Sequence, residues 1–418
     1  MQEFASPYDY GAVGDGIADD TAAVQQAIDF IHGRGGGTVT LACGAVYRIT
    51  DTLILGSGVR FEVNGATIRM DTDDIAIIEV SKTSQNNGWS IHGPGLLCYL
   101  TQQDHEQTGA IGIKLSAANS YSYNFLIAGP LTIRDANTGI GNPPETGSFV
   151  FDGEIANVTA YGCSNWGLDI DCDAANGGNT NLAIRNVYAL QPENLEQPES
   201  KGHRFRATVG LLITNLIGDH LQKEWLYIES SSGKIDYLHF ESCDPSAMTG
   251  QLNLITLFNC ASMRIGEVHG VGNNIDISGD ADCYVLRLDG ALLDLHTIRL
   301  QDTTFTDSSS GTIYTVVPTA GTLVTNEVFI QTAPGGSPIA ANLADFGIHK
   351  AIIRWNGEDR MRLRQGGVVE VFDSAPPTSE TWAVGDLVTN TAPSSGQPIG
   401  WVCVSAAPTT WKAFGTIS

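Results

Sequence analysis

Six runs decide the fold: IANVTAYGC (155–163), LAIRNVYAL (182–190), LLITNLIGDHL (211–221), IDYLHFESC (235–243), MRIGEVHG (263–270) and LLDLHTIRLQD (292–302). Their first residues are 24 to 29 residues apart. Each unit holds two or three short apolar runs separated by Gly, Asn, Asp and Ser. Self-similarity at a period of about 20–50 residues is typical of a solenoid.

A second series lies between these runs: WGLDIDC (166–172), HRFRA (203–207), WLYIES (225–230), LITLFN (254–259) and YVLRLDG (284–290). Helical repeats need apolar residues at i, i+3, i+4 and i+7, whereas these runs alternate with period two. An ordinary β-sandwich also has strands that recur every ~8–12 residues, and it is the alternative. The pattern predicts an all-β solenoid.

The segment before the repeats, YDYGAVGDGIADDTAAVQQAID (8–29), predicts a helix. Asp20 or Thr21 is a suitable N-cap, and the apolar residues of the helix are Ala22, Val24, Ala27, Ile28 and Ile31. Residues 35–37 are all glycine and end it, and strands are expected over 38–41 and 46–49. A helix in this place would cover the open end of the stack and hide its unpaired strand edge.

This segment, followed by GGGTVTL and VYRI, resembles the N-terminal signature of the pectate-lyase-like family. The family includes polysaccharide lyases, polygalacturonase-like hydrolases and bacteriophage tailspikes. The resemblance implies a right-handed parallel β-helix, which the N-terminal helix would cap. The different composition of the last fifty residues, with Trp382, Trp401 and Trp411 among Gly, Pro and Ser turns, predicts a small C-terminal β-module. The resemblance also implies a polysaccharide substrate and, as in spikes of this type, a homotrimer.

We expect four parts along the chain. Residues 1–50 are the cap, 51–302 the parallel β-helix, 303–365 a β-rich connecting or oligomerisation region with a hairpin centred on Asn356-Gly357, and 366–418 a small β-module. Three polar stretches are expected to be loops that leave the stack, at 100–108, 135–147 and 192–200. Binding residues often lie on such excursions from a rigid scaffold.

Charge and composition restrict the partners. The net charge is −24, from 46 acidic and 22 basic residues, and binding to nucleic acid or anionic membranes needs a basic face. No apolar stretch approaches the ~20 residues of a membrane span. The eight cysteines form no CxxC pair, and several end an apolar run, which predicts small buried residues. The resemblance implies an extracellular protein, either secreted or part of a phage tail, whose leader was removed or whose export takes another route.

The second series also predicts the site. With Leu168, Ile170, Phe205, Leu226 and Ile228 pointing inward, the outward set is Asp169, Asp171, Arg204, Arg206, Tyr227, Glu229, Arg287 and Asp289, and Lys114 lies on a comparable face. Residues i and i+2 on a strand are ~6.6 Å apart. Asp169 and Asp171 therefore have the spacing of a carboxyl pair that admits a water molecule, and like charges so close raise one of the two pKa values.

We predict that Asp169, Asp171 and Glu229 are catalytic, with Glu229 about two coils (~10 Å) away as the second carboxylate. Glu224 is a weaker candidate. The predicted sugar-binding residues are His203, Arg204, Arg206, Tyr227, Trp166 and Trp225. The arginines and His203 would act as cationic donors. They are equally compatible with a structural ladder of ion pairs.

Three functions remain open. Hydrolysis of a glycan by paired carboxylates needs no cofactor. A lyase would use Arg206 or Tyr227 as base on a uronate, and Ca²⁺ bound by Asp169, Asp171 and Asp173 is then possible. The third function is a non-catalytic glycan-binding spike, in which the acids form a solvated face.

Overall fold

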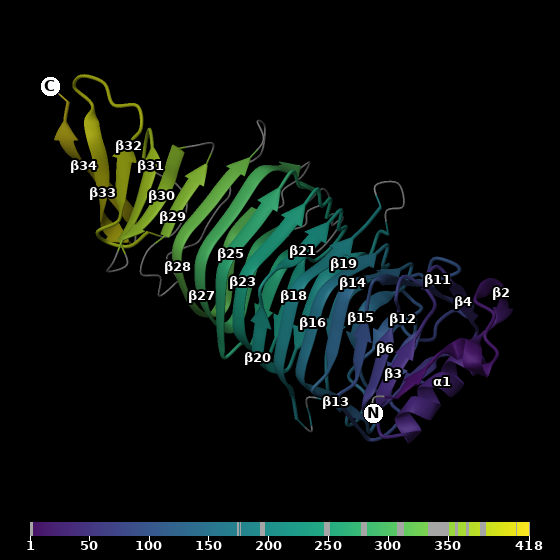
Figure 1. The fold of residues 1–418 in the computed structure, drawn as a ribbon. Helices are drawn as coiled ribbons and strands as arrows, with labels where there is room; N and C mark the ends of the chain where they lie inside the picture. Colours follow the sequence, from purple (N-terminus) through teal and green to yellow (C-terminus); the bar gives the residue numbers. More distant parts are fainter. Residues whose placement is uncertain are drawn as a thin grey trace.

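The chain folds into an elongated parallel β-helix (Figure 1). The computed structural model describes residues 3–173, 175, 177–192, 197–245, 251–276, 282–306, 313–332, 351–355, 358–364, 368–376, 382–406 and 408–417. The coils stack from the cap at the N-terminal end to the small module at the C-terminal end. The predicted fold class is confirmed.

One face of the stack, here called the site face, is made of the shorter strands. Each strand pairs in parallel with the next one in this series: β5 (Leu53–Leu55), β8 (Ile78–Val80), β12 (Ile111–Lys114), β15 (Thr138–Asn142), β17 (Trp166–Ile170), β19 (Lys201–Arg206), β22 (Leu226–Glu229), β24 (Gln251–Phe258) and the first part of β27 (Asp282–Thr306). The runs of the second series form the strands from β17 to β27.

The six repeated runs build the other faces. One series is β1 (Phe4–Ala5), β3 (Gly37–Thr40), β6 (Val59–Glu62), β10 (Ser90–His92), β14 (Leu126–Arg134), β16 (Phe149–Tyr161), β18 (Asn179–Leu190), β20 (Thr208–Ile213), β23 (Ser232–Glu241), β25 (Ser262–Val271) and β27. The other joins β2 (Asp15–Asp19), β4 (Val46–Ile49), β7 (Thr67–Met70), β11 (Gly95–Tyr99), the later parts of the long strands, and β21 (Leu216–Asp219). Short strands β9 (Gln85–Asn87), β13 (Tyr121–Tyr123) and β26 (Asn274–Asp276) complete the coils.

The cap is helix α1 (Thr21–Gly33), preceded by a 3-10 turn, η1 (Pro7–Tyr10). Asp20 takes the N-cap position, but its side chain accepts hydrogen bonds from the backbone N–H groups of Val13 and Gly14 at 2.7 and 3.0 Å. Ala23, and not the predicted Ala22, shares the buried stripe with Val24 and Ile28. In the described part of the chain, no helix has the length and apolar composition needed to span a membrane.

The predicted loop at 135–147 is wrong in its centre, because β15 lies within it and is fully buried. Its sequence, TGIGN, lacks the large alternating residues that mark the other strands. Glycine is required at Gly139, since a Cβ there would lie 2.6 Å from the carbonyl oxygen of Gly167 on the next coil. Close packing between coils therefore hid this strand from the hydrophobic pattern.

Asparagines at one corner form a ladder between coils. Asn186 donates from its amide to Asn157 Oδ1 at 3.0 Å, and Asn215 donates to Asn186 Oδ1 at 3.3 Å. The φ angles of Asn157 and Asn186 are 57° and 52°, a left-handed conformation that asparagine adopts more readily than most residues. The same residue type thus makes the turn and links it to its neighbours.

All eight cysteines are free, and every one except Cys43 is buried. Burial raises the pKa of the Cys98 and Cys172 thiols to about 11 and that of Cys163 to about 12. The predicted role of these residues in the core is confirmed.

We expect the native protein to react with a thiol reagent at Cys43 alone, because reaction needs an accessible thiolate. In denaturant all eight thiols should react. Counting the modified cysteines by mass spectrometry measures both numbers. Rapid modification of a second cysteine without denaturant would contradict the packing described here.

The parallel stack continues past the predicted boundary at 302, because β28 (Ile313–Thr332) pairs in parallel with β27. Then β29 (Ala351–Trp355), β30 (Glu358–Arg364) and β31 (Val368–Asp373) pair antiparallel, so the first two flank the predicted hairpin centre at 356–357, which lies outside the described residues. The C-terminal module contains β32 (Leu387–Asn390), β33 (Pro398–Ala406) and β34 (Thr409–Thr416). Trp382 is buried there, edge-on to Trp411 at 5.3 Å between ring centres.

Candidate active site

The strand registers place charged residues of successive coils in one column on the site face. Lys114 pairs with Gly141, Gly141 with Asp169, Asp169 with Arg204, and Arg204 with Tyr227. Thr256 and then Arg287 continue the column on β24 and β27. The inward residues Leu168, Ile170, Phe205, Leu226 and Ile228 are fully buried. The predicted vertical alignment is confirmed.

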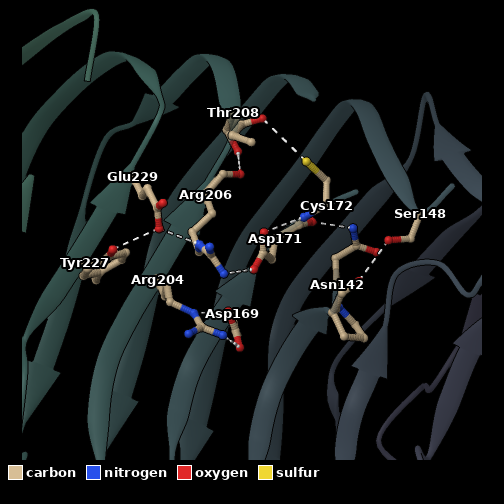
Figure 2. Close-up of polar contacts among 12 residues, drawn as sticks. Asn142, Ser148, Asp169, Asp171, Cys172, Arg204, Arg206, Thr208, Tyr227 and Glu229 are labelled. Atoms are coloured by element: carbon tan, nitrogen blue, oxygen red, sulfur yellow. Dashed lines mark hydrogen bonds and ion pairs between the residues drawn. The ribbon is translucent and has the colours of Figure 1, made fainter. Parts of the chain in front are cut away.

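Asp169 and Arg204 form a bidentate ion pair between β17 and β19 (Figure 2). Arg204 Nε and Nη2 donate to the two carboxylate oxygens of Asp169, each at 2.6 Å. Burial lowers the pKa of Arg204, but the bonds to Asp169 outweigh it, so the net direction is upward. This geometry holds the Asp169 carboxylate in one orientation.

A second ion-pair system crosses three coils beside the first (Figure 2). Arg206 Nη1 donates to Asp171 Oδ2, and Arg206 Nε donates to Glu229 Oε2, both at 2.7 Å. The Tyr227 hydroxyl donates to the same Glu229 Oε2 at 2.9 Å. Glu229 Oε1 has no hydrogen-bond partner among the described residues, and the side chain is 21% exposed. Glu229 is therefore a partly exposed carboxylate with one oxygen that is not bonded to the described part of the protein.

Asp171 differs from Asp169 and Glu229 because only 3% of its side chain is exposed. Its Oδ1 accepts a hydrogen bond from the backbone N–H of Cys172 at 2.8 Å. The pKa of Asp171 is raised, as predicted for one member of the pair, but mainly by burial, and the like charge of Asp169 contributes less. A carboxyl so enclosed argues against the predicted catalytic role of Asp171 and favours one in positioning Arg206.

Replacing Arg206 with alanine should destabilise the fold by about 2–3 kcal/mol at neutral pH. This is below the ~3–5 kcal/mol for breaking a fully buried pair, because Arg206 is 35% exposed and solvent screens it. The loss of stability should be larger at pH ~7 than at pH ~4 because of Asp171, whose pKa is raised in the folded protein. A buried carboxyl of this kind stabilises the fold when it is protonated, and that contribution is lost as pH rises through its folded pKa. Removing the guanidinium raises this pKa further.

Denaturant unfolding at the two pH values measures the effect of Arg206→Ala. The matched control is Arg185→Ala, whose partner Glu154 lies on a neighbouring coil; there both side chains are exposed, at 47% and 39%, so the expected loss is under ~1 kcal/mol. Adding Asp171→Asn should recover most of the stability of Arg206→Ala. Equal losses in the two arginine variants would contradict this account.

Three predicted sugar-binding residues lie in the wrong place for that role. His203 is fully buried, its Nε2 lies 3.2 Å from the Ile217 carbonyl oxygen, and burial lowers its pKa to about 4, so it is neither cationic nor exposed. Trp225 is fully buried and stacked on Phe240 at 4.8 Å. Trp166 is 4% exposed, with the Lys201 ammonium 5.1 Å from its ring centre. His203 and Trp166 take inward positions, because the alternation that turns Arg204 and Asp169 outward turns them inward. Trp225 is buried for another reason: it precedes β22, so the alternation that turns Tyr227 outward does not extend to it.

The structure places Glu224, only a weaker candidate from the sequence, in a cluster beside the column. Glu224, just before β22, accepts a hydrogen bond from Thr256 Oγ1 at 2.6 Å, and burial raises its pKa to about 7 although Lys201, Arg204 and Arg287 lower it. Burial also lowers the pKa of Lys201, which donates to Asn165 Oδ1 at 3.1 Å. Glu224 stands outside the alternating run, so the strand pattern gave no signal for it.

The N-terminal end of the same column has a cavity of about 420 Å³ between β8, β12 and the segment at 143–145. Lys114 lies in its wall and pairs with Glu79 at 3.1 Å and Glu145 at 2.8 Å. The bonds to these carboxylates keep the pKa of Lys114 raised against the effect of burial. The site face thus carries charge from Glu79 to Arg287.

The acids do not suit a calcium ion. Asp169 and Asp171 are each bound to an arginine, and Asp173 Oδ2 accepts the backbone N–H of Gly147 at 2.8 Å. The guanidinium groups beside Asp169 and Asp171 oppose a divalent cation there. Within the described residues, no group of three or more His, Cys, Asp or Glu side chains is arranged to hold a metal.

The strand registers and the stacked site face make this chain a parallel β-helix protein. No family model matches the sequence. Mannuronan C5-epimerase AlgE1 of Azotobacter vinelandii is 60% identical over 42 residues, which are 10% of this chain and 3% of that protein. Plasmin and fibronectin-binding protein A of Streptococcus pneumoniae is 47% identical over 57 residues, 13% of this chain and 8% of that protein. The chain therefore spans only a small part of these curated relatives.

Among solved structures, the chain is similar to a double mutant of the tailspike protein of E. coli bacteriophage HK620. The two share 14% sequence identity with a TM-score of 0.48, over 92% of this chain and 70% of the tailspike chain. At this level the likeness concerns the fold.

Proposed function

We propose that this protein is an extracellular polysaccharide depolymerase that hydrolyses glycosidic bonds on the site face. The observation that carries the proposal is the register of Asp169, Arg204, Arg206, Tyr227 and Glu229 on three successive coils, with the acids and arginines bonded to one another. A rigid row of charged and hydroxyl groups suits a polymer with many hydroxyls. The local likeness to mannuronan C5-epimerase AlgE1, an enzyme named for a polysaccharide, supports a glycan as the substrate class.

Glu229 is the proposed general base. Arg206 and Tyr227 occupy its Oε2, so the free Oε1 can accept a proton from a water molecule. Hydrolysis then needs a carboxylate to activate water and a protonated group for the leaving oxygen. The Arg204–Asp169 pair would position the sugar by hydrogen bonds to its hydroxyls.

The test is to incubate the protein with a panel of capsular and plant polysaccharides and to measure the products by mass spectrometry. We expect oligosaccharides whose masses include one added water per cleavage. Products without added water, with an unsaturated end that absorbs in the ultraviolet, would show that the reaction is elimination and not hydrolysis. Glycan that binds but keeps its length would contradict both hydrolysis and elimination.

Elimination with Arg206 or Tyr227 as base is the weaker reading of the site. Burial lowers the pKa of Arg206, but its bonds to Asp171 and Glu229 raise it overall, and burial with the bond to Glu229 raises the pKa of Tyr227. A base must be deprotonated to act, and both groups hold their protons more tightly than usual.

A non-catalytic glycan-binding protein is the second candidate. The complete pairing of Asp169 and Asp171 with arginines favours it, because paired acids are equally suited to stabilising the stack. The homotrimer that the resemblance implies stays a prediction, and sedimentation equilibrium would measure it.

A further inference from the structure

A carboxyl group outside the predicted set lies at the edge of the column. Glu224 belongs to the coil of β22, like Tyr227 and Glu229, but precedes the strand. Its Oε1 accepts a hydrogen bond from Thr256 Oγ1 at 2.6 Å, and Thr256 is the register partner of Tyr227 on β24. The Glu224 carboxyl therefore reaches from the beginning of its own strand to the column, on the side of β24.

Glu229 reaches to the other side of Tyr227. Its carboxylate is bonded to Arg206, which lies on β19. The strands β19, β22 and β24 are adjacent and about 4.8 Å apart. The Glu229 carboxylate is bonded toward β19 and the Glu224 carboxyl toward β24, so the two groups lie on opposite sides of Tyr227. One sugar linkage placed over Tyr227 would have a carboxyl group on each side.

We infer that Glu224 is the proton donor of the glycan-cleaving site, acting across Tyr227 from Glu229. The inference rests on the proposed hydrolysis. Glu224 gives its proton to the glycosidic oxygen as the bond from that oxygen to the anomeric carbon breaks. Glu229 takes a proton from the water whose oxygen bonds to that carbon. Glu224 ends as a carboxylate and Glu229 as an acid, and exchange with solvent restores both.

The surroundings of Glu224 suit a proton donor. The residue is half-buried and not fully enclosed. Burial raises its pKa to about 7, while the bond from Thr256 and the charges of Lys201, Arg204 and Arg287 lower it. A carboxyl that keeps its proton near neutral pH can act as a general acid there. Once it has given the proton up, the nearby cations stabilise the carboxylate.

The experiment uses the full chain and whichever polysaccharide of the panel the wild type cleaves. Glu224→Gln should cut the cleavage rate about 10²–10⁴-fold, and it should remove the fall in rate that the wild type shows above pH ~7. Thr256→Val removes the bond that lowers the pKa of Glu224, so the alkaline limb should move to higher pH. Glu154→Gln, a surface acid on β16, is the matched control and should cleave at the wild-type rate.

A second measurement needs no substrate. A carboxyl whose folded pKa is raised stabilises the fold when protonated, and this contribution is lost as pH rises through the folded pKa. The melting temperature of the wild type should therefore fall between pH ~5 and ~8 relative to that of Glu224→Gln.

The outcomes separate the two proposals. If the wild type cleaves glycan and a folded Glu224→Gln variant cleaves it at the same rate, this inference is overturned and the proposed hydrolysis is not. If the melting temperatures of the wild type and of Glu224→Gln change with pH in the same way, the proton-donor role is overturned independently of activity. A wild type that cleaves no glycan would overturn hydrolysis, and the inference with it.

Discussion

Glu229→Gln is expected to lower the rate of glycan cleavage by about 10²–10⁴-fold, the contribution of a general base. Glutamine keeps an oxygen that can accept from Arg206 and Tyr227, as Glu229 Oε2 does at 2.7 and 2.9 Å. It cannot take a proton from water. The loss should therefore fall on kcat, with KM close to that of the wild type, since ground-state contacts remain.

The reducing ends released per unit time measure this effect. Glu241→Gln, at an exposed acid on β23 and away from the site face, is the matched control and should be indistinguishable from the wild type. Glu229→Asp keeps the carboxylate but withdraws it by one methylene, so an intermediate rate is expected. A folded Glu229→Gln variant within a few-fold of the wild-type rate would remove Glu229 from the mechanism.

The fold could be predicted because a β-helix repeats the same physical problem in every coil. Each strand must bury alternate residues, so the period of the runs and the inward set, such as Phe205 and Ile228, follow from the pattern. The strand β15 was not predicted because Gly139 packs against the backbone of Gly167, where a larger residue would not fit, so the strand has a weak hydrophobic pattern. The end of the parallel stack was placed too early because the polar, Ser-rich sequence at 302–311 interrupts the apolar runs before β28 continues the stack.

The site could be predicted only as far as alternation reaches. Register explains why Asp169, Arg204 and Tyr227 meet, because parallel coils of similar length bring equivalent positions together. Alternation does not show how deeply an outward residue is enclosed, so the burial of Asp171 was not foreseen. Nor does it describe residues before a strand, and Glu224 reaches the column from such a position.

Trp225→Ala is expected to destabilise the protein by about 3–5 kcal/mol, the usual cost of truncating a large aromatic residue in a core. The indole is fully buried, stacked on Phe240 at 4.8 Å with an angle of 20° between the rings. Its Nε1 has no hydrogen-bond partner among the described residues, so the ring contributes through packing alone.

The same variant separates the two roles considered for Trp225. If Trp225 is a core residue, its truncation lowers the free energy of unfolding and leaves the affinity of the folded protein for glycan unchanged. If Trp225 stacks on a sugar, its truncation lowers the affinity and leaves the free energy of unfolding unchanged. Trp225→Phe keeps an aromatic ring and removes the unpaired N–H, so its loss should be well below that of alanine. Trp401→Ala, at a partly exposed tryptophan of the C-terminal module, should also cost less. Urea unfolding measures the stability of the three variants, and glycan binding is measured on each folded protein. A Trp225→Ala variant that lost affinity but not stability would contradict the packing role.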